Sequence, residues 1–161
     1  MTELVFMRHG HALSRTEAGV NSDSERPLSA AGEKEVLEAA LHLSGSGFAP
    51  DLIISSPFRR ADRTAQIAAG VFPSAARQTA PALSDGPPQA LVDLVQQFYE
   101  GKDRVLIVGH QPLLGGIAGY FLGQEGFDLF PAGFVHLKPG KNPGTAVLAE
   151  FYAPPPPKDL R

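Results

Sequence analysis

Six short apolar runs along the chain have the length and residue types of β-strands. The first and fourth, residues 4–7 and 105–108, are continuously apolar, which is typical of central strands in a parallel sheet covered on both faces. The predicted strands span residues 4–7, 51–55, 77–80, 104–108, 133–138 and 146–152.

Helical periodicity fills most of the intervals between these runs. Ser29 is a suitable cap for a helix that continues to about Leu43. A second helix is predicted with Pro57 in its first turn, ending at about Gly70. Two further helices are predicted from Pro88 to about Tyr99 and from Pro112 onward.

Alternating strands and helices predict a three-layer α/β/α sandwich around a mainly parallel sheet. The turn-rich segment between the last two strands, "KPGKNPGT", indicates that these two form an antiparallel hairpin. No linker or repeat divides the chain, so we expect one domain over residues 1–161, of which 154–161 are a Pro-rich tail.

Composition narrows the classes of protein that this chain can represent. A net charge of −3 argues against non-specific binding to nucleic acid or an anionic membrane. The absence of cysteine excludes disulfides, thiolate metal sites and a cysteine nucleophile. No apolar run approaches the ~20 residues that span a bilayer, and no basic, apolar leader precedes the first strand. We therefore expect a cytoplasmic protein, and a monomer.

Polar residues that carry chemistry follow three of the predicted strands. They lie in "RHG" at residues 8–10, "SSPFRR" at 55–60 and "GHQP" at 109–112. Ligands in open α/β sheets bind beyond the carboxyl ends of the strands, so these loops are expected to share one crevice. Arg59 and Arg60 fall in the first turn of a helix, where the dipole disfavours cations, and an anion bound there would explain them.

Other interpretations of these residues remain open from spacing alone. Arg8 needs an anionic partner if it is half-buried, and Glu3, Asp51 or Asp62 could supply one. His9 and His11 could begin a metal site, but the neighbouring arginines would repel a cation. The chain has no phosphate-binding G-x-x-x-x-G-K-[ST] loop and no G-x-S-x-G serine elbow.

Four segments, in order, resemble the histidine phosphatase superfamily of phosphoglycerate-mutase-like enzymes. They read "MRHGHA" from residue 7, "ERPLSAAGEKE" from 25, "LIISSPFRRADRTAQIA" from 52 and "VLIVGHQPLLGGIAGYFLG" from 105. The short interval between Gly10 and Arg26, and the total length, are most similar to SixA-type phosphohistidine phosphatases. The resemblance implies a phosphoglycerate-mutase-like fold.

The resemblance also implies roles for particular residues. His9 would be the nucleophile and become phosphohistidine, while Arg8, Arg60 and a positively charged His110 would bind the phosphoryl oxygens. Further substrate contacts are expected from His11, Arg26 and Gln111, although an ion pair of Arg26 with Asp23 or Glu25 is an alternative. No metal or other cofactor is expected. His42 and His136 are interpreted as structural or exposed residues.

The leaving group distinguishes the possible substrates. An alkoxide leaving group requires a positioned general acid, and Asp85, in a turn-forming "SDGP", is the only carboxylate in the comparable stretch. Phosphohistidine relaxes this requirement, so we predict hydrolysis of phosphohistidine on a partner protein, with phosphate as product. The alternatives are a small-molecule phosphomonoesterase of the same fold and a non-catalytic phosphate-binding or interaction module.

Overall fold

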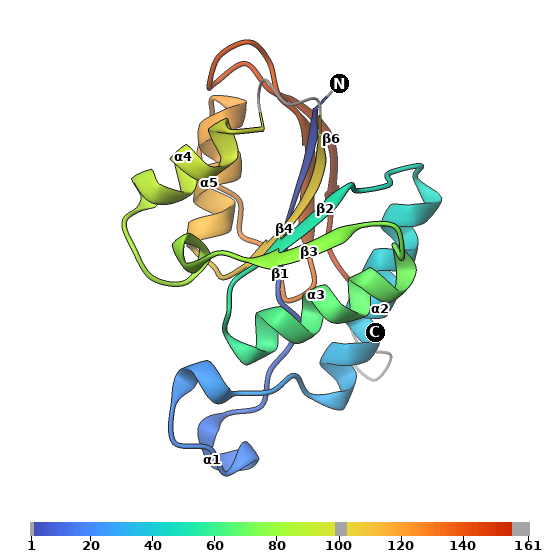
Figure 1. Ribbon diagram of the computed structural model, residues 1–161, viewed down its shortest axis with the longest axis vertical. Helices are drawn as coiled ribbons and strands as arrows, with labels where there is room; N and C mark the ends of the chain where they lie inside the picture. Colours follow the sequence, from blue (N-terminus) through green and yellow to red (C-terminus); the bar gives the residue numbers. More distant parts are fainter. Residues whose placement is uncertain (1, 99–102, 156–161) are drawn as a thin grey trace.

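A six-stranded mixed sheet, in the order β3-β2-β4-β1-β5-β6, forms the centre of the molecule (Figure 1). The structure is a computed structural model that describes residues 2–98 and 103–155. The strands are β1 (Glu3–Arg8), β2 (Leu52–Ser55), β3 (Ala76–Thr79), β4 (Arg104–Gly109), β5 (Phe134–Lys138) and β6 (Val147–Tyr152). The strands β1 to β4 are mutually parallel, and β5 and β6 are antiparallel additions at one side.

The register of the central strands aligns the two loops that carry the histidines. In β1 and β4 the residue pairs run from Glu3 opposite Arg104 to Arg8 opposite Gly109. His9 continues this ladder, because its amide donates to the Gly109 carbonyl oxygen at 3.0 Å. Strand β2 lies on the other side of β4, so the segment that follows Ser55 leaves the sheet at the same edge.

Helices cover both faces of the sheet, as the predicted three-layer fold requires (Figure 1). On one face α2 (Ala30–Gly45) and α3 (Arg59–Val71) bury an apolar stripe against Val5, Met7 and Leu106. On the other, α4 (Pro88–Gln96) and α5 (Leu113–Leu122) pack with Phe6, Ile54 and Ile107. Side chains alternate between the two cores along each strand, so the central strands are apolar throughout.

Most element boundaries agree with the sequence prediction to within about two residues, and the differences have local causes. Helix α3 begins at Arg59, so Pro57 lies before the helix and not in its first turn. Helix α4 ends at Gln96, three residues earlier than predicted, and Tyr99 lies outside the described residues. The antiparallel hairpin of β5 and β6 is confirmed, with a register shift between His136 and Leu137.

Two short elements between β1 and α2 were not predicted. They are α1 (Arg15–Ala18) and the 3-10 helix η1 (Asp23–Glu25). Helix α1 has a complete capping box, in which Ser14 and Glu17 each bind the other's backbone amide. The helix is too short to show helical periodicity, so only the residues of its capping box could have indicated it. No helix among the described residues is long and apolar enough to cross a membrane.

Candidate active site

The three predicted loops converge on one pocket at the carboxyl edge of the parallel strands. The pocket has a volume of about 270 Å³. Arg8 and His9 reach it from the end of β1, Arg60 from the first turn of α3, and His110 from the loop after β4. The other lining residues are His11, Ala12, Arg26, Gln111 and Pro131. The seven residues that the resemblance assigned to catalysis or substrate binding therefore line one cavity, whereas Asp85, the candidate general acid, does not.

His9 is held in one tautomer with its Nε2 lone pair available. The ring is buried, and its Nδ1 lies 2.7 Å from the carbonyl oxygen of Gly10, which can only accept a hydrogen bond. Nδ1 therefore carries the proton, and Nε2 accepts a hydrogen bond from Nε of Arg60 at 3.2 Å. Burial, opposed by the Gly10 bond and assisted by the charges of His110, Arg60 and Arg8, lowers the pKa of His9 to about 3. The imidazole is thus neutral and nucleophilic at pH 7.

Three nitrogen atoms of the Arg60 guanidinium each donate a hydrogen bond. Besides His9, its Nη1 donates to the carbonyl oxygen of Asp23 at 2.7 Å, and its Nη2 donates to Asp23 Oδ2 at 3.0 Å. The guanidinium is buried and lies over the Phe58 ring at 5.2 Å. The sequence analysis named Asp23 only as a partner of Arg26, and its contact with Arg60 was missed because no local pattern connects positions 37 residues apart.

His110 faces His9 with a ring separation of 5.1 Å. Its Nε2 lies 2.8 Å from the hydroxyl oxygen of Ser56, a fully buried residue that the sequence analysis did not single out. Burial, reinforced by the charge of Arg60, lowers the pKa of His110 to about 4. His110 is therefore neutral at pH 7 in the anion-free protein, and the imidazolium expected in the complex with a phosphoryl group stays a prediction. A bound phosphoryl group would raise this pKa, because its negative charge favours the protonated ring.

Arg8 has no carboxylate partner among the described residues. The three candidates are engaged elsewhere: Glu3 pairs with His136, Asp62 with Arg77, and Asp51 accepts from the Arg104 amide. Arg8 Nη1 donates to the Leu129 carbonyl oxygen at 2.9 Å, and its buried Nε has no hydrogen-bond partner. Burial and the charge of Arg60 lower the pKa of Arg8. The half-buried guanidinium thus carries a positive charge that no described carboxylate neutralises.

Helix packing fixes the loop that carries His9. The Gly10 amide donates to the Thr64 hydroxyl at 3.1 Å, and that hydroxyl donates to the Arg60 carbonyl oxygen at 2.8 Å. Gly32 in α2 lies so close to this loop that a Cβ atom there would overlap the His11 carbonyl oxygen. Thr64, which the sequence analysis also did not single out, therefore links the loop after β1 directly to the helix that carries Arg60.

The remaining predicted pocket residues have structural bonds of their own. His11 Nδ1 lies 2.8 Å from the Ser29 hydroxyl, and the Gln111 amide group bridges the Phe127 carbonyl and the Gly115 amide. Arg26 lines the pocket and also forms the predicted ion pair with Asp23, at 3.0 Å. His42 and His136 lie away from the pocket, paired with Glu150 and Glu3 respectively.

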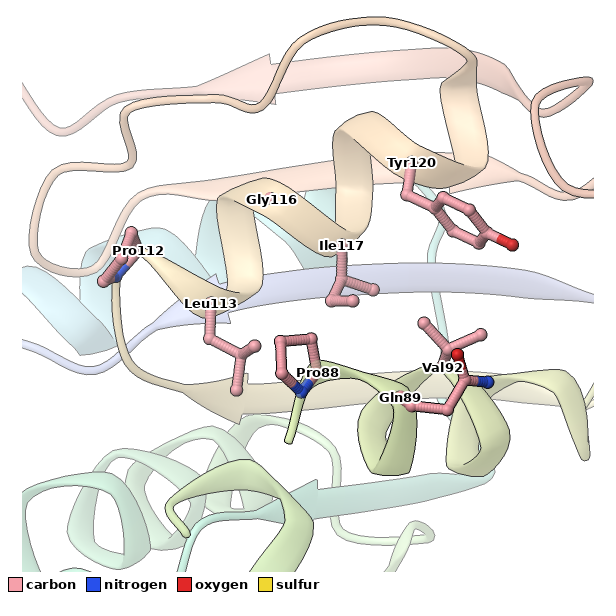
Figure 2. Close-up of a pocket in the computed structure, with 8 residues that line it drawn as sticks. All are labelled: Pro88, Gln89, Val92, Pro112, Leu113, Gly116, Ile117 and Tyr120. Atoms are coloured by element: carbon pink, nitrogen blue, oxygen red, sulfur yellow. The ribbon is translucent and has the colours of Figure 1, made fainter. Parts of the chain in front are cut away.

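Asp85 is exposed and does not line the pocket, although its charge is close enough to contribute to the pKa of His110. A larger, mainly apolar hollow of about 520 Å³ lies between α4 and α5 and extends from Pro112 to Tyr120 (Figure 2). Its walls include Pro88, Val92 and Ile117 and carry no charged side chain. Within the described parts of the chain, no group of three or more His, Asp or Glu side chains is placed to hold a metal ion.

A buried neutral imidazole whose Nε2 lone pair is directed at an arginine, at the carboxyl edge of a parallel sheet, defines a site for phosphoryl-group chemistry. The family comparison agrees with this class. Residues 4–85 match the model of the histidine phosphatase superfamily (branch 1), and the chain belongs to that superfamily. Membership supports a hydrolase of the phosphatase type.

Known proteins resemble this chain over nearly its whole length. The uncharacterized protein SYNPCC7002_A2622 of Picosynechococcus sp. is 34% identical over 146 residues, which is 86% of each chain. The structure of the protein histidine phosphatase SixA complexed with tungstate has a TM-score of 0.84 at 23% identity, over 99% of each chain. A phosphoserine phosphatase from Entamoeba histolytica, in complex with 3-phosphoglyceric acid, has a TM-score of 0.71 at 20% identity, over 95% of this chain and 98% of that one. The expected fold is confirmed by these matches.

Proposed function

We propose that this protein hydrolyses phosphohistidine on a partner protein through a covalent phosphohistidine intermediate at His9. Arg8, Arg60 and His110 bind the phosphoryl oxygens, and no metal ion takes part. The observation that carries the proposal is the state of His9. Its proton is held on Nδ1 by the Gly10 carbonyl, so the Nε2 lone pair faces a pocket that contains the buried Arg60 and the half-buried Arg8.

In the first step the Nε2 lone pair of His9 attacks phosphorus, and the P–N bond of the substrate breaks. The bonding electron pair returns to the substrate imidazole, which leaves as a neutral ring because solvent has protonated its other nitrogen. His9 keeps its Nδ1 proton and becomes a positively charged phosphoimidazole, which the Gly10 carbonyl stabilises. Arg60 Nε must exchange its bond to His9 for a phosphoryl oxygen in this step.

In the second step water attacks the phosphorus of the intermediate. The P–Nε2 electron pair returns to His9, the water proton passes to the departing phosphate or to solvent, and the neutral imidazole is restored. The arginines and His110 stabilise the charge on the equatorial oxygens in both steps. These cationic groups do the electrostatic work that metal ions perform in many other phosphoryl-transfer sites.

Trapping of the phosphoenzyme tests this proposal. The protein is incubated with ³²P-labelled phosphoramidate and quenched in alkali, and the acid-labile label is mapped to a peptide. We expect label on the peptide that contains His9 in the wild type and none in His9→Ala. His42→Ala is the matched control, since His42 lies outside the pocket, and it should be labelled like the wild type. Absence of label from the wild type, with no phosphate released, would favour the non-catalytic binding module.

A small-molecule phosphomonoesterase is the second candidate, and the position of Asp85 favours it. The carboxylate lies close enough to influence the pKa of His110, so a rearrangement of its turn could bring it to an alkoxide leaving group. Rates with a phosphohistidine protein, p-nitrophenyl phosphate and sugar phosphates would separate the two candidates. We expect Asp85→Asn to leave phosphohistidine turnover unchanged. Loss of all monoester turnover in this variant, with monoesters the better wild-type substrates, would establish the second candidate.

A further inference from the structure

Asp23 is the one carboxylate that contacts the arginines of the pocket among the described residues. Its Oδ2 accepts from Arg60 at 3.0 Å and its Oδ1 accepts from Arg26 at 3.0 Å, so each oxygen serves one guanidinium. Its backbone carbonyl binds Arg60 as well, at 2.7 Å. The residue belongs to η1, in the connection between β1 and α2, and its side chain is 58% exposed.

The pocket itself has a large excess of positive charge. Arg8, Arg26 and Arg60 line it together with His9 and His110, and no acidic side chain is among its lining residues. Such a cavity would hold a phosphate dianion strongly, since the desolvated guanidinium of Arg60 forms charge-assisted hydrogen bonds of the stronger kind. A hydrolase must release free phosphate after every turnover, so strong retention of the product would slow it.

We infer that Asp23 is an affinity-setting residue, an internal anion that competes with phosphate for Arg60 and Arg26 and thereby promotes product release. The inference rests on the proposed function and concerns the same site. When phosphate binds, the carboxylate either gives up its bond to Arg60 Nη2 or remains and repels the bound anion. Both cases weaken the complex. When phosphate leaves, Asp23 keeps the guanidinium paired and oriented beside His9.

Asp23 is poorly suited to act as the general acid. Hydrogen bonds from Arg26 and Arg60 lower its pKa, so it is ionised at neutral pH and has no proton to give. Both carboxylate oxygens are already bound to guanidinium groups. Asp23 therefore acts through the arginines and not on the leaving group.

Calorimetric titration of the 161-residue chain with inorganic phosphate tests the inference. Asp23→Asn keeps the shape of the side chain and the backbone carbonyl that binds Arg60, and removes the negative charge together with one of the two acceptor oxygens. We expect the Kd for phosphate to fall about fivefold, the factor that one unit charge contributes at a few ångströms in a water-like dielectric. Structural damage would weaken binding, so the direction of the change distinguishes the two explanations.

Asp62→Asn is the matched control, because it also removes a carboxylate that pairs with an arginine, Arg77, outside the pocket. Its Kd for phosphate should equal that of the wild type. An unchanged or higher Kd in Asp23→Asn, with normal binding by the wild type, would overturn the inference and leave the proposed function intact. If neither the wild type nor Asp23→Asn binds phosphate, the inference is wrong, whereas the proposed function is refuted separately, by the absence of label on His9 and of released phosphate in the trapping experiment.

Discussion

At the scale of single residues, the site depends on hydrogen-bond partners that orient the rings of His9 and His110. The Ser56 hydroxyl lies 2.8 Å from His110 Nε2 and also accepts from the Phe58 amide at 3.2 Å. The Phe58 amide occupies one acceptor position of the hydroxyl, so the Ser56 proton is free to point at His110. The Gly10 carbonyl acts in the opposite sense on His9, because it accepts the proton of Nδ1. The tautomers of both histidines therefore depend on neighbours that would not touch the substrate.

We predict that Ser56→Ala lowers kcat/KM by about 3- to 10-fold, the equivalent of one lost hydrogen bond to His110. In a His110→Ala background the same substitution should have no further effect, because the hydroxyl would act only through that ring. The measurement is a double-mutant cycle on steady-state rates with phosphoramidate. Ser46→Ala, which removes a comparable hydroxyl bond at the end of α2, should retain the wild-type rate. Additive effects of the Ser56 and His110 substitutions would contradict the prediction.

At the scale of elements, α2 and α3 contact the chain between β1 and α2 and fix its position. Helix α2 packs against the loop after β1, and α3 binds η1. The two arginines that begin α3 diverge, as their spacing on a helix predicts. Arg60 reaches the pocket that contains His9, whereas Arg59 donates to the Glu25 carbonyl and lines a separate hollow. Both arginines bind backbone carbonyls of η1, which explains how cations are accommodated at the positive end of a helix dipole.

The contact of α2 with the loop after β1 gives a second prediction. Gly32→Ala would place a methyl group against the His11 backbone, so either the helix or the loop must move. We expect the free energy of unfolding to fall by about 1–3 kcal/mol, together with a loss of activity. Chemical denaturation and steady-state rates measure the two effects. Gly45→Ala in the same helix is the control, since a Cβ there meets no atom within 4 Å, and it should be neutral or slightly stabilising.

At the scale of the whole molecule, folding keeps two histidines neutral that would be protonated in the unfolded chain. Burial lowers the pKa of His9 from 6.5 to about 3 and that of His110 from 6.5 to about 4. Below pH 6.5 the unfolded state therefore binds more protons than the folded state. Stability is fully present above the unfolded pKa and is lost as the pH falls toward the folded values. The folded state therefore keeps two neutral imidazoles in a cationic pocket, and in return it loses stability at acid pH.

We predict that the free energy of unfolding declines as the pH falls from about 6.5 to 5, a range in which the carboxylates remain ionised. The upper limit of the slope is about 1.4 kcal/mol per pH unit for each histidine. Urea denaturation at several pH values in phosphate-free buffer provides the measurement. A His9→Gln/His110→Gln double variant should have a much flatter profile. Identical slopes in the wild type and this variant would show that the two histidines do not titrate as described.

The sequence by itself determined the strands, the main helices, and the edge of the sheet where Arg8, His9, Arg60 and His110 would meet. Those features follow from local periodicity and from the rule that parallel strands end together. Only the tertiary structure decided what holds the four residues. Ser56 meets His110 across 54 positions, and Asp23 meets Arg60 across 37. Such contacts leave no periodic signal, because they depend on how helices pack on the sheet. Burial, which sets the pKa values of both histidines, likewise belongs to the folded molecule and not to any segment of it.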